Sequence, residues 1–494
     1  MRSLSLLASC AAALLPFAQA ESNLTVPEVS KQILSSTFKP QQVFQHTNLV
    51  RTINLEKEYS RETINVVVEN VDDRPQFEYY LPFEQSIIAR VGGLEVKEKN
   101  RPDLVYPQPY IVGYDTYSPE EYFLITFPVS LEPKQKVTLS ITYSILSALK
   151  PVPASINQAD KQYVQFGFSA YVPSAYKTLK QKTKVKLPST DAPEYTTLGV
   201  NEDGKDDPQK QGATFTYGPY TDIPAGATYV AAIRYEFTKP LLHSTLLERD
   251  VEVSHWGGNL ATEERHWFEN RGATLKAQFS RVAWQQMQYY HPATSALKEF
   301  QYPVMIGSTD PYFIDDIGNV STSRFRPVNN AKEGLLELRP RYPIFGGWKY
   351  SFRVGWDSNL KNFLRKLKTG DGYVLKVPFI EGPKQGEGVE YEKVVLRIVL
   401  PEGATNVKYE TSMPLIGEKL DMHRTFMDTL GRTTLKLTAL NVVDDFRDRD
   451  VIVTYDYPFM AGFRKPTVIF ASVLGTFSFA WVVSKLDVSI GRKA

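Results

Sequence analysis

The sequence predicts a mostly β protein: two tandem β-rich, sandwich-like domains on the lumenal side of a membrane, followed by one C-terminal transmembrane helix. Three observations predict this class. The 494 residues include 28 Tyr and 27 Phe but only 7 Met, and aromatic side chains favour pleated, half-buried surfaces. Strand-like runs recur along both halves of the chain. An uncharged apolar segment of spanning length follows them.

The composition bounds the size of the cores and the class of partner. The chain has 57 Lys and Arg against 55 Asp and Glu, and 42% of its residues are hydrophobic. This is a globular composition, large enough for two or three cores. A formal net charge of +2 is too small for a protein that wraps nucleic acid, which needs a basic stripe. We therefore expect no nucleic-acid partner.

Residues 1–20 match a secretory signal peptide. Arg2 precedes an apolar run over 4–15, and Ala18-Gln19-Ala20 forms a small-residue cleavage site. The run is too short to span a bilayer. Cleavage after Ala20 would also remove Cys10, the single cysteine, so the mature chain would depend on packing alone for its stability.

The strand-like runs form two sets of similar order, which predicts one domain used twice. The first set covers 63–71, 121–129, 136–145, 182–188 and 227–237. The second covers 251–255, 348–356, 373–379, 393–401 and 451–459. Three pairs of segments resemble each other: those opening at Tyr163 and Tyr373, those ending at Pro188 and Pro401, and those around Tyr235 and Tyr455. We expect one lumenal domain over 21–243 and a second over 244–465, because single cores stop growing near this size.

Helices are expected to be few. Leu360, Phe363, Leu364 and Leu367 have the spacing of an amphipathic helix, which predicts a helix over 360–368. A second helix is predicted over 282–290. The polar run 201–211 predicts a solvated loop.

The apolar segment 467–484 predicts a membrane helix, because it carries no charge and basic residues flank it. After a cleaved signal peptide, this helix makes the chain single-pass and type I, with residues 485–494 as a short cytosolic tail. Ala471, Gly475 and Ser478 recur at spacings of four and three and share one face. Small residues let another helix approach closely, which favours docking on a partner helix over a plain anchor.

Motifs for catalysis are not found. None of the six histidines belongs to an HExxH pair, and no nucleophile elbow or phosphate-binding glycine loop follows a strand. We therefore assign no catalytic, cofactor-binding or metal residues. The triplet Asp448-Arg449-Asp450 resembles the D-x-D pattern of nucleotide-sugar transferases, but 444–450 alternates in sign, which is typical of a solvated turn.

Two glycine-aromatic segments could present stacking faces to a sugar or to another protein. One is His255-Trp256-Gly257-Gly258 and the other is 345–356. In the second, the five even-numbered residues Trp348, Tyr350, Phe352, Val354 and Trp356 alternate, which favours one buried strand face. Both interpretations stay open at this point.

Two acceptor sequons for N-glycosylation are present, Asn23-Leu24-Thr25 and Asn319-Val320-Ser321. Both fall on the lumenal side of the predicted topology. They are suited to a chain that passes through the endoplasmic reticulum.

Long strings of the second half resemble a known family. The segments 251–273 (VEVSHWGGNLATEERHWFENRGA), 339–356 (RPRYPIFGGWKYSFRVGW) and 451–459 (VIVTYDYPF), with one C-terminal membrane helix, resemble the ribophorin I family. That family is the non-catalytic subunit 1 of the eukaryotic oligosaccharyltransferase. The resemblance covers nearly the whole mature chain.

The resemblance implies a subunit of the endoplasmic-reticulum membrane complex that transfers a preassembled oligosaccharide from dolichol diphosphate to Asn of N-x-S/T sequons on nascent polypeptides. It implies a role in assembly, stability and substrate handling, with no cofactor. The implied partners are the catalytic and accessory subunits of the complex, with nascent polypeptide as a further candidate. The tail 485–494 is short, as in fungal-type members, so a ribosome contact through a long cytosolic extension is not carried over.

Two other classes compete with this interpretation. One is a type I membrane lectin or cargo receptor of the secretory pathway that recognises glycans through the Trp348 region. The other is a membrane-tethered glycosyltransferase using Asp448 and Asp450. Copurification separates them, because only the oligosaccharyltransferase interpretation requires a stable multi-subunit membrane assembly.

Overall fold

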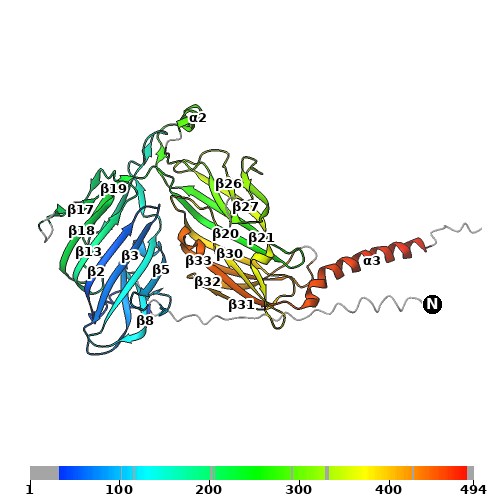
Figure 1. Cartoon of the computed structure of the whole chain (residues 1–494), viewed down its shortest axis with the longest axis horizontal. Helices are drawn as coiled ribbons and strands as arrows, with labels where there is room; N and C mark the ends of the chain where they lie inside the picture. The colour runs from blue at the N-terminus through cyan, green and yellow to red at the C-terminus, as the bar shows by residue number, and fades with distance from the viewer. Residues whose placement is uncertain are drawn as a thin grey trace, which may run out of the picture.

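The computed structural model describes residues 33–486, apart from 102, 115–116, 119, 201–203, 205, 291–292, 329–332 and 426–427. The predicted signal peptide and Asn23 lie outside the described residues, as does the predicted tail beyond residue 486. The described chain is mostly β, as predicted, and ends in one long helix (Figure 1).

The strands form two β-rich halves that lie side by side, and each half has one large sheet and two smaller ones (Figure 1). In the first half the seven-stranded sheet has the order β17 (Gln209–Gln211), β18 (Thr214–Ile223), β13 (Lys177–Lys186), β2 (Phe44–Asn54), β3 (Ser60–Asn70), β9 (Lys136–Ile145), β5 (Val91–Glu98). Its smaller sheets are β10 (Leu149–Pro151), β12 (Tyr163–Ser169), β19 (Val230–Glu236), β14 (Glu194–Tyr195), and β4 (Gln76–Glu84), β8 (Glu120–Leu131), β6 (Tyr110–Ile111).

The second half repeats this arrangement. Its seven-stranded sheet has the order β24 (Thr309–Asp315), β27 (Lys349–Asn359), β21 (Asn259–Asn270), β20 (Leu242–Ser254), β30 (Glu390–Val399), β33 (Arg432–Val443), β32 (Gly417–His423). Its smaller sheets are β28 (Leu364–Lys366), β29 (Gly372–Pro378), β34 (Asp450–Asp456), β31 (Thr405–Thr411), and β23 (Phe300–Met305), β26 (Glu333–Leu338), β25 (Arg324–Arg326).

Short pairs and helices complete the described elements. The pairs are β1 (Ile33–Leu34) with β7 (Gly113–Tyr114), β11 (Ser155–Ile156) with β22 (Thr274–Leu275), and β15 (Gly199–Val200) with β16 (Asp206–Asp207). The helices are α1 (Gln85–Ile88), α2 (Arg281–Tyr290), α3 (Arg464–Ser484) and the 3-10 turns η1 (Leu360–Asn362), η2 (Asp444–Asp448) and η3 (Phe459–Phe463). The helix predicted over 282–290 is therefore confirmed.

The repeat extends to single residues of the central strands. β2 pairs antiparallel with β3 and parallel with β13, just as β20 pairs antiparallel with β21 and parallel with β30. Phe44 pairs with Asn70 in the first half and Leu242 with Asn270 in the second. Both asparagines are fully buried and donate to two backbone carbonyls each. The boundary between the domains, placed near residue 243, stays a prediction.

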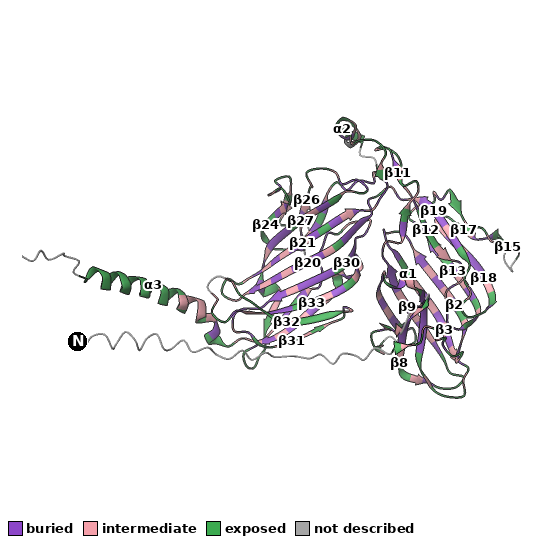
Figure 2. Ribbon diagram, turned by 180° about the vertical axis from the view of Figure 1, so that it is seen from behind, coloured by how far each residue is buried: buried purple, intermediate pink, exposed green. Residues whose placement is uncertain are grey.

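Each large sheet buries one face beneath its smaller sheets (Figure 2). Along β3, every second residue from Ser60 to Asn70 is buried and the residues between them are exposed or half-buried. Such alternation is what a half-buried strand requires, because successive side chains point to opposite faces. Most buried apolar residues of the second half form one core, which Tyr59 and Leu146 of the first half join. Trp284, Ala296 and Phe345 form a small separate cluster.

Two local predictions are wrong. The helix predicted over 360–368 is a single 3-10 turn followed by β28, because pairing of β28 with β29 satisfies the backbone and outweighs a weak helical propensity. The run 206–211, predicted as a solvated loop, contains β16 and β17. Asp207 is buried there and accepts hydrogen bonds from the Gly218 backbone N–H at 3.0 Å and the Tyr220 hydroxyl at 2.5 Å.

Candidate functional site

The C-terminal helix is the first candidate for function. α3 projects from the second half, away from the first (Figure 1), and no residue of it is buried. Among the described residues, Phe459–Ser484 is the only segment long and apolar enough to cross a membrane, with a mean hydropathy of 1.8. Ser472 and Thr476 donate their hydroxyls to carbonyls four residues earlier, so these polar groups are satisfied inside the helix.

The small residues of α3 face open space. Ala471, Gly475 and Ser478 are all exposed. Apart from its chain neighbours and the backbone of α3 itself, a Cβ placed on Gly475 would meet no heavy atom of the described chain within 4 Å. The described part of this chain therefore leaves the face uncovered.

The N-terminal end of α3 is attached to the second half by an ion pair. The Lys465 Nζ lies 3.3 Å from the Asp428 carboxylate. Burial raises the pKa of Asp428, but hydrogen bonds from Thr425 and the charge of Arg432 lower it by a larger amount. The resulting pKa is about 2. Asp428 is thus ionised at physiological pH and holds the beginning of the helix against the domain.

Asn319 lies on an exposed turn after β24. Its side chain is exposed, as is Ser321 of the sequon. The Asn319 carbonyl accepts a hydrogen bond from the Arg341 guanidinium at 3.0 Å, and the neighbouring Val320 N–H donates to the Phe313 carbonyl at 2.9 Å. The backbone of the turn is therefore fixed while the acceptor amide faces outward.

The acidic motifs do not converge on a metal. Among the described residues, no group of three or more His, Cys, Asp or Glu side chains could hold a metal ion. Asp448 is exposed, and Asp450 pairs with Lys376 at 2.8 Å. Asp448 is the last residue of the turn η2, whereas Asp450 is the first residue of β34, so only Asp448 lies in the predicted turn.

Asp444 contradicts the solvated-turn interpretation. It is only 9% exposed. It accepts a hydrogen bond from the Tyr59 hydroxyl at 2.7 Å and forms an ion pair with Lys57 at 2.8 Å. Both partners come from the other half of the chain. The residues next to Asp444 in the sequence do not indicate that its partners lie in the other half.

Asp444 belongs to an interface that we call the seam, where residues 57–61, 89–95 and 147 of the first half meet 390, 441 and 444–449 of the second. The Ser147 backbone N–H donates to the Glu390 carboxylate at 2.7 Å. The Asn441 amide donates to the carbonyls of Ala89 and Val91 at 2.8 and 3.0 Å. The seam joins the two halves through directional polar contacts.

Charged side chains lie inside both large cores. Arg51 pairs with Glu62 at 2.7 Å in the first half, and Arg249 pairs with Glu264 at 2.7 Å in the second. Arg51 and Arg249 occupy equivalent positions of β2 and β20. Burial raises the pKa of Glu264, but hydrogen bonding to His266 and the charge of Arg249 hold it near 2. These groups are enclosed in the cores, so we assign them to stability.

The histidines are used internally as well. His46 is fully buried and lies 3.1 Å from the Thr178 hydroxyl and 3.2 Å from the Tyr79 hydroxyl. Burial lowers the pKa of His46 to about 3. His255 is hydrogen-bonded to Tyr455 at 2.8 Å.

The buried His46 predicts a pH dependence of stability. An unfolded histidine takes up a proton below about pH 6.5, whereas folded His46 stays neutral to about pH 3. The unfolded state then binds more protons, so the free energy of unfolding falls as pH falls through this window. Between pH 6.5 and 5, the free energy of unfolding should fall by about 1 to 2 kcal/mol less in His46→Asn than in the parent, as measured by urea unfolding. The exposed His423→Asn variant is the control and should show the same fall as the parent. The prediction is wrong if His46→Asn also shows the same fall as the parent.

The aromatic strand is confirmed as a core element. Tyr350, Phe352, Val354 and Trp356 of β27 are at most 5% exposed, and Trp348 is half-buried. Trp256 differs, because it is 78% exposed at the tip of the β20–β21 hairpin. An exposed aromatic face therefore exists at Trp256 and not along β27.

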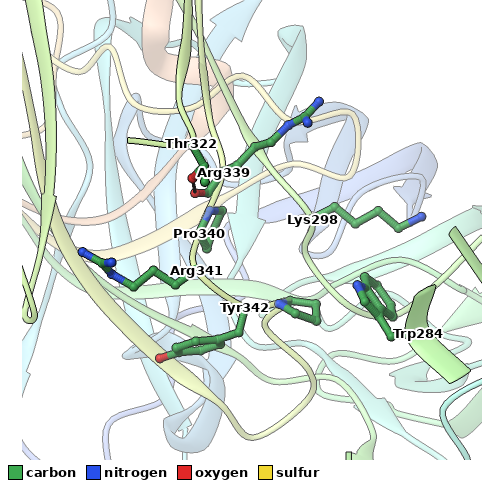
Figure 3. A pocket seen from close by; sticks show the side chains of 8 residues that line it. Trp284, Lys298, Thr322, Arg339, Pro340, Arg341 and Tyr342 are labelled. Carbon is green, nitrogen blue, oxygen red and sulfur yellow. Dashed lines mark hydrogen bonds between the residues drawn. The ribbon is translucent and has the colours of Figure 1, made fainter. Parts of the chain in front are cut away.

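A pocket of about 370 Å³ lies between α2 and the segment before β27 (Figure 3). Its lining residues are Trp284, Lys298, Thr322, Arg339, Pro340, Arg341, Tyr342 and Pro343. Arg341 is paired with Asp315 at 2.6 Å and Arg339 with Glu299 at 3.3 Å, while the Lys298 ammonium lies 5.7 Å from the centre of the Trp284 ring. The lining contains no carboxylate, histidine or cysteine that could act as a general base or nucleophile.

Sequence comparison relates the chain to one family. The sequence profile named Ribophorin I matches residues 44–484. The Schizosaccharomyces pombe protein named dolichyl-diphosphooligosaccharide–protein glycosyltransferase subunit 1 is 31% identical over 447 residues, which cover 88% of this chain and 94% of that protein. The Caenorhabditis elegans protein of the same name is 33% identical, covering 72% of this chain and 58% of that protein. Subunit 1B of Arabidopsis thaliana is 29% identical over 93% of this chain and 96% of that protein.

Among solved structures, an M1 zinc metallopeptidase from Deinococcus radiodurans aligns with 43% of this chain and 42% of its own, at 12% identity and a TM-score of 0.25. A likeness at this level bears on neither fold nor function.

Proposed function

The chain belongs to the ribophorin I family, and from this membership we propose that it is subunit 1 of the complex that transfers oligosaccharide from dolichyl diphosphate to protein. The observation that carries the proposal is the family match over 44–484, together with a relative of that name covered over 94% of its length. The relatives' names place them in a glycosyltransferase of several subunits. The proposed partners are the catalytic and accessory subunits, with nascent polypeptide as a further candidate.

We propose that this subunit is non-catalytic and acts in assembly, stability and substrate handling. The support is that its chemistry-bearing side chains have internal tasks. Glu264 and His266 lie in a core, Asp444 lies in the seam, and Asp450 pairs with Lys376. Catalysis needs such groups gathered where a substrate can reach them.

We further propose an endoplasmic-reticulum location as a single-pass type I membrane protein, with the β halves in the lumen. The apolar helix at the end of the described chain and the signal-like residues 1–20 support this topology. Each half lies before α3, so both would share one compartment.

The test is copurification with activity. The tagged full chain, extracted in digitonin, should retain other membrane subunits and transfer dolichyl-diphosphate-linked oligosaccharide to an Asn-x-Thr peptide. Asp448→Ala with Asp450→Ala should leave turnover of the assembled complex nearly unchanged. Recovery of the chain alone would refute the subunit assignment, whereas loss of turnover by orders of magnitude with unchanged composition would refute the non-catalytic role.

Glycosylation gives a prediction on topology. We propose Asn319 and Asn23 as acceptors, and the exposed turn supports Asn319. Asn319→Gln should remove one glycan and so raise the gel mobility of the protein. Digestion with peptide N-glycosidase should then raise the mobility of this variant by less than it raises that of the parent. Asn319→Asp is the matched variant, because it keeps the shape and also removes the acceptor amide. A parent-like mobility in both variants would contradict the prediction.

The small-residue face of α3 gives a prediction on assembly. We propose that Ala471, Gly475 and Ser478 dock against a helix of a partner subunit. Gly475→Leu should weaken this association by about 1 to 2 kcal/mol, because a large side chain separates the helix backbones. The readout is subunit recovery after detergent extraction, with alkaline extraction to show that the helix stays inserted. Val473→Leu is the matched control off the face; equal recovery with both variants would make α3 a plain anchor.

A further inference from the structure

The hairpin tip at Trp256 lies at the same end of the second half as the beginning of α3. The Gly258 carbonyl accepts a hydrogen bond from the Leu360 N–H at 3.0 Å, which places η1 on the hairpin tip. The rings of His255 and Tyr457 are 4.4 Å apart, and the Tyr457 N–H donates to the Asp371 carbonyl at 2.9 Å. The hairpin tip, the segment 360–371 and the turn η3 therefore form one surface, which we call the foot.

The foot exposes large apolar side chains. Trp256 is 78% exposed, Phe459 76%, Met460 73%, Leu367 49% and Phe463 48%. Neighbouring exposed side chains of this kind are unusual on a soluble surface and indicate a partner. Three of the five lie in η3, which runs directly into the membrane helix.

The foot also carries unpaired positive charge. Lys361, Arg365, Lys366 and Lys368 are all exposed, and none has an acidic partner among the described residues. The Arg365 guanidinium donates only to nearby carbonyls, and the Lys366 ammonium lies 5.6 Å from the centre of the Tyr373 ring. Arg464 follows at the beginning of α3, next to Lys465, which pairs with Asp428.

We propose that the foot sits in the headgroup layer of the phospholipid membrane that α3 crosses, and so holds the second half against the membrane surface. Aromatic rings with a polar edge concentrate at the interface between hydrocarbon and water. Lysine and arginine there meet lipid phosphates. The continuity of η3 with α3 brings the foot to the membrane, and the mixture of aromatic and basic groups matches lipid better than a purely apolar protein surface.

The test measures the depth of single nitroxide labels on the full chain, which carries Cys10→Ser and is purified with the subunits it retains. The labels replace Trp256 and Met460 in the foot, and Tyr289 at the end of α2 as the aqueous control. The probe membrane is a nanodisc of phosphatidylcholine and phosphatidylserine. We expect collisions with oxygen to exceed those with a water-soluble nickel chelate several-fold at 256 and 460, and the reverse at 289.

Each other outcome overturns the proposal. Nickel collisions in excess at 256 and 460 would place the foot in water. Low collision rates with both reagents would mean that a protein subunit covers it. Alkaline extraction and subunit recovery are followed in parallel, so that loss of insertion or assembly is recognised separately from a misplaced foot.

Charge reversal gives the second arm. Lys366→Glu with Lys368→Glu should raise nickel collisions at the 460 label at least threefold, because the foot loses its attraction to phosphate. Lys180→Glu with Lys184→Glu is the matched control, since both lysines are exposed on β13 of the first half and have no acidic partner among the described residues. An equal effect of the two pairs, or no effect of either, would refute the role of the basic residues.

Discussion

Replacing Arg249 with methionine is expected to lower the free energy of unfolding by about 3 to 5 kcal/mol. The guanidinium is 1% exposed and lies 2.7 Å from the Glu264 carboxylate and 2.8 Å from that of Glu381. Without it, Glu264 is left buried with only His266 and backbone N–H groups as partners. Urea unfolding of the full chain, followed by tryptophan fluorescence, measures the loss.

Two comparisons make the Arg249 prediction specific. Arg265→Met removes a similar pair with Glu263, but the arginine side chain is 41% exposed there, so the loss should stay below about 1 kcal/mol. Combining Arg249→Met with Glu264→Gln should recover part of the stability, because the unpaired charge is removed. Equal losses in the free energy of unfolding for Arg249→Met and Arg265→Met would show that the buried pair contributes no more to stability than the exposed pair.

Opening the seam is expected to have the next largest effect. A Cβ on Gly92 would stand 1.8 Å from the backbone carbonyl oxygen of Asn441, so Gly92→Ala must push β5 away from β33. That movement breaks the bonds from the Asn441 amide to Ala89 and Val91. We expect a cost of about 1 to 3 kcal/mol.

Hydrogen exchange followed by mass spectrometry measures the effect on the seam. Peptides over 86–95 and 439–449 should exchange about tenfold faster or more, as a loss of 1.4 kcal/mol requires. Gly167→Ala is the control, because a Cβ on that strand glycine would meet nothing within 4 Å. Unchanged exchange at the seam with Gly92→Ala would mean that the two halves are not held together there.

Regular alternation explains which strands could be predicted. The predicted run 136–145 has the same bounds as β9, because polar and apolar side chains alternate along it without interruption. The sequence pattern predicts only the last residues of β20, and it predicts no strand at β2. In both strands an arginine occupies the buried face, Arg249 and Arg51, and hides the alternation from any count of apolar positions.

Contacts between distant parts of the chain could not be predicted. Asp444 looks like a solvated carboxylate because its buried partner Tyr59 lies 385 positions away. The segment 360–368 has helical spacing, yet strand pairing with β29 decides its structure. The membrane helix and the sequons could be located from local sequence, because each depends only on its own residues. The foot could not, because the fold alone brings Trp256 and Phe459 to one end.

The parallel pairing at the centre of each large sheet has a consequence for synthesis. Leu49 pairs with Gln181, and Leu247 with Val394, so each central strand waits for a partner that is translated much later. At translation rates of about 5 to 20 residues per second, the wait is on the order of ten seconds. During that time β2 and then β20 expose an unpaired edge, which invites pairing with other chains. Each of the two intervals therefore leaves the growing chain open to mispairing, and crowding of ribosomes on one message should favour mispairing between neighbouring copies.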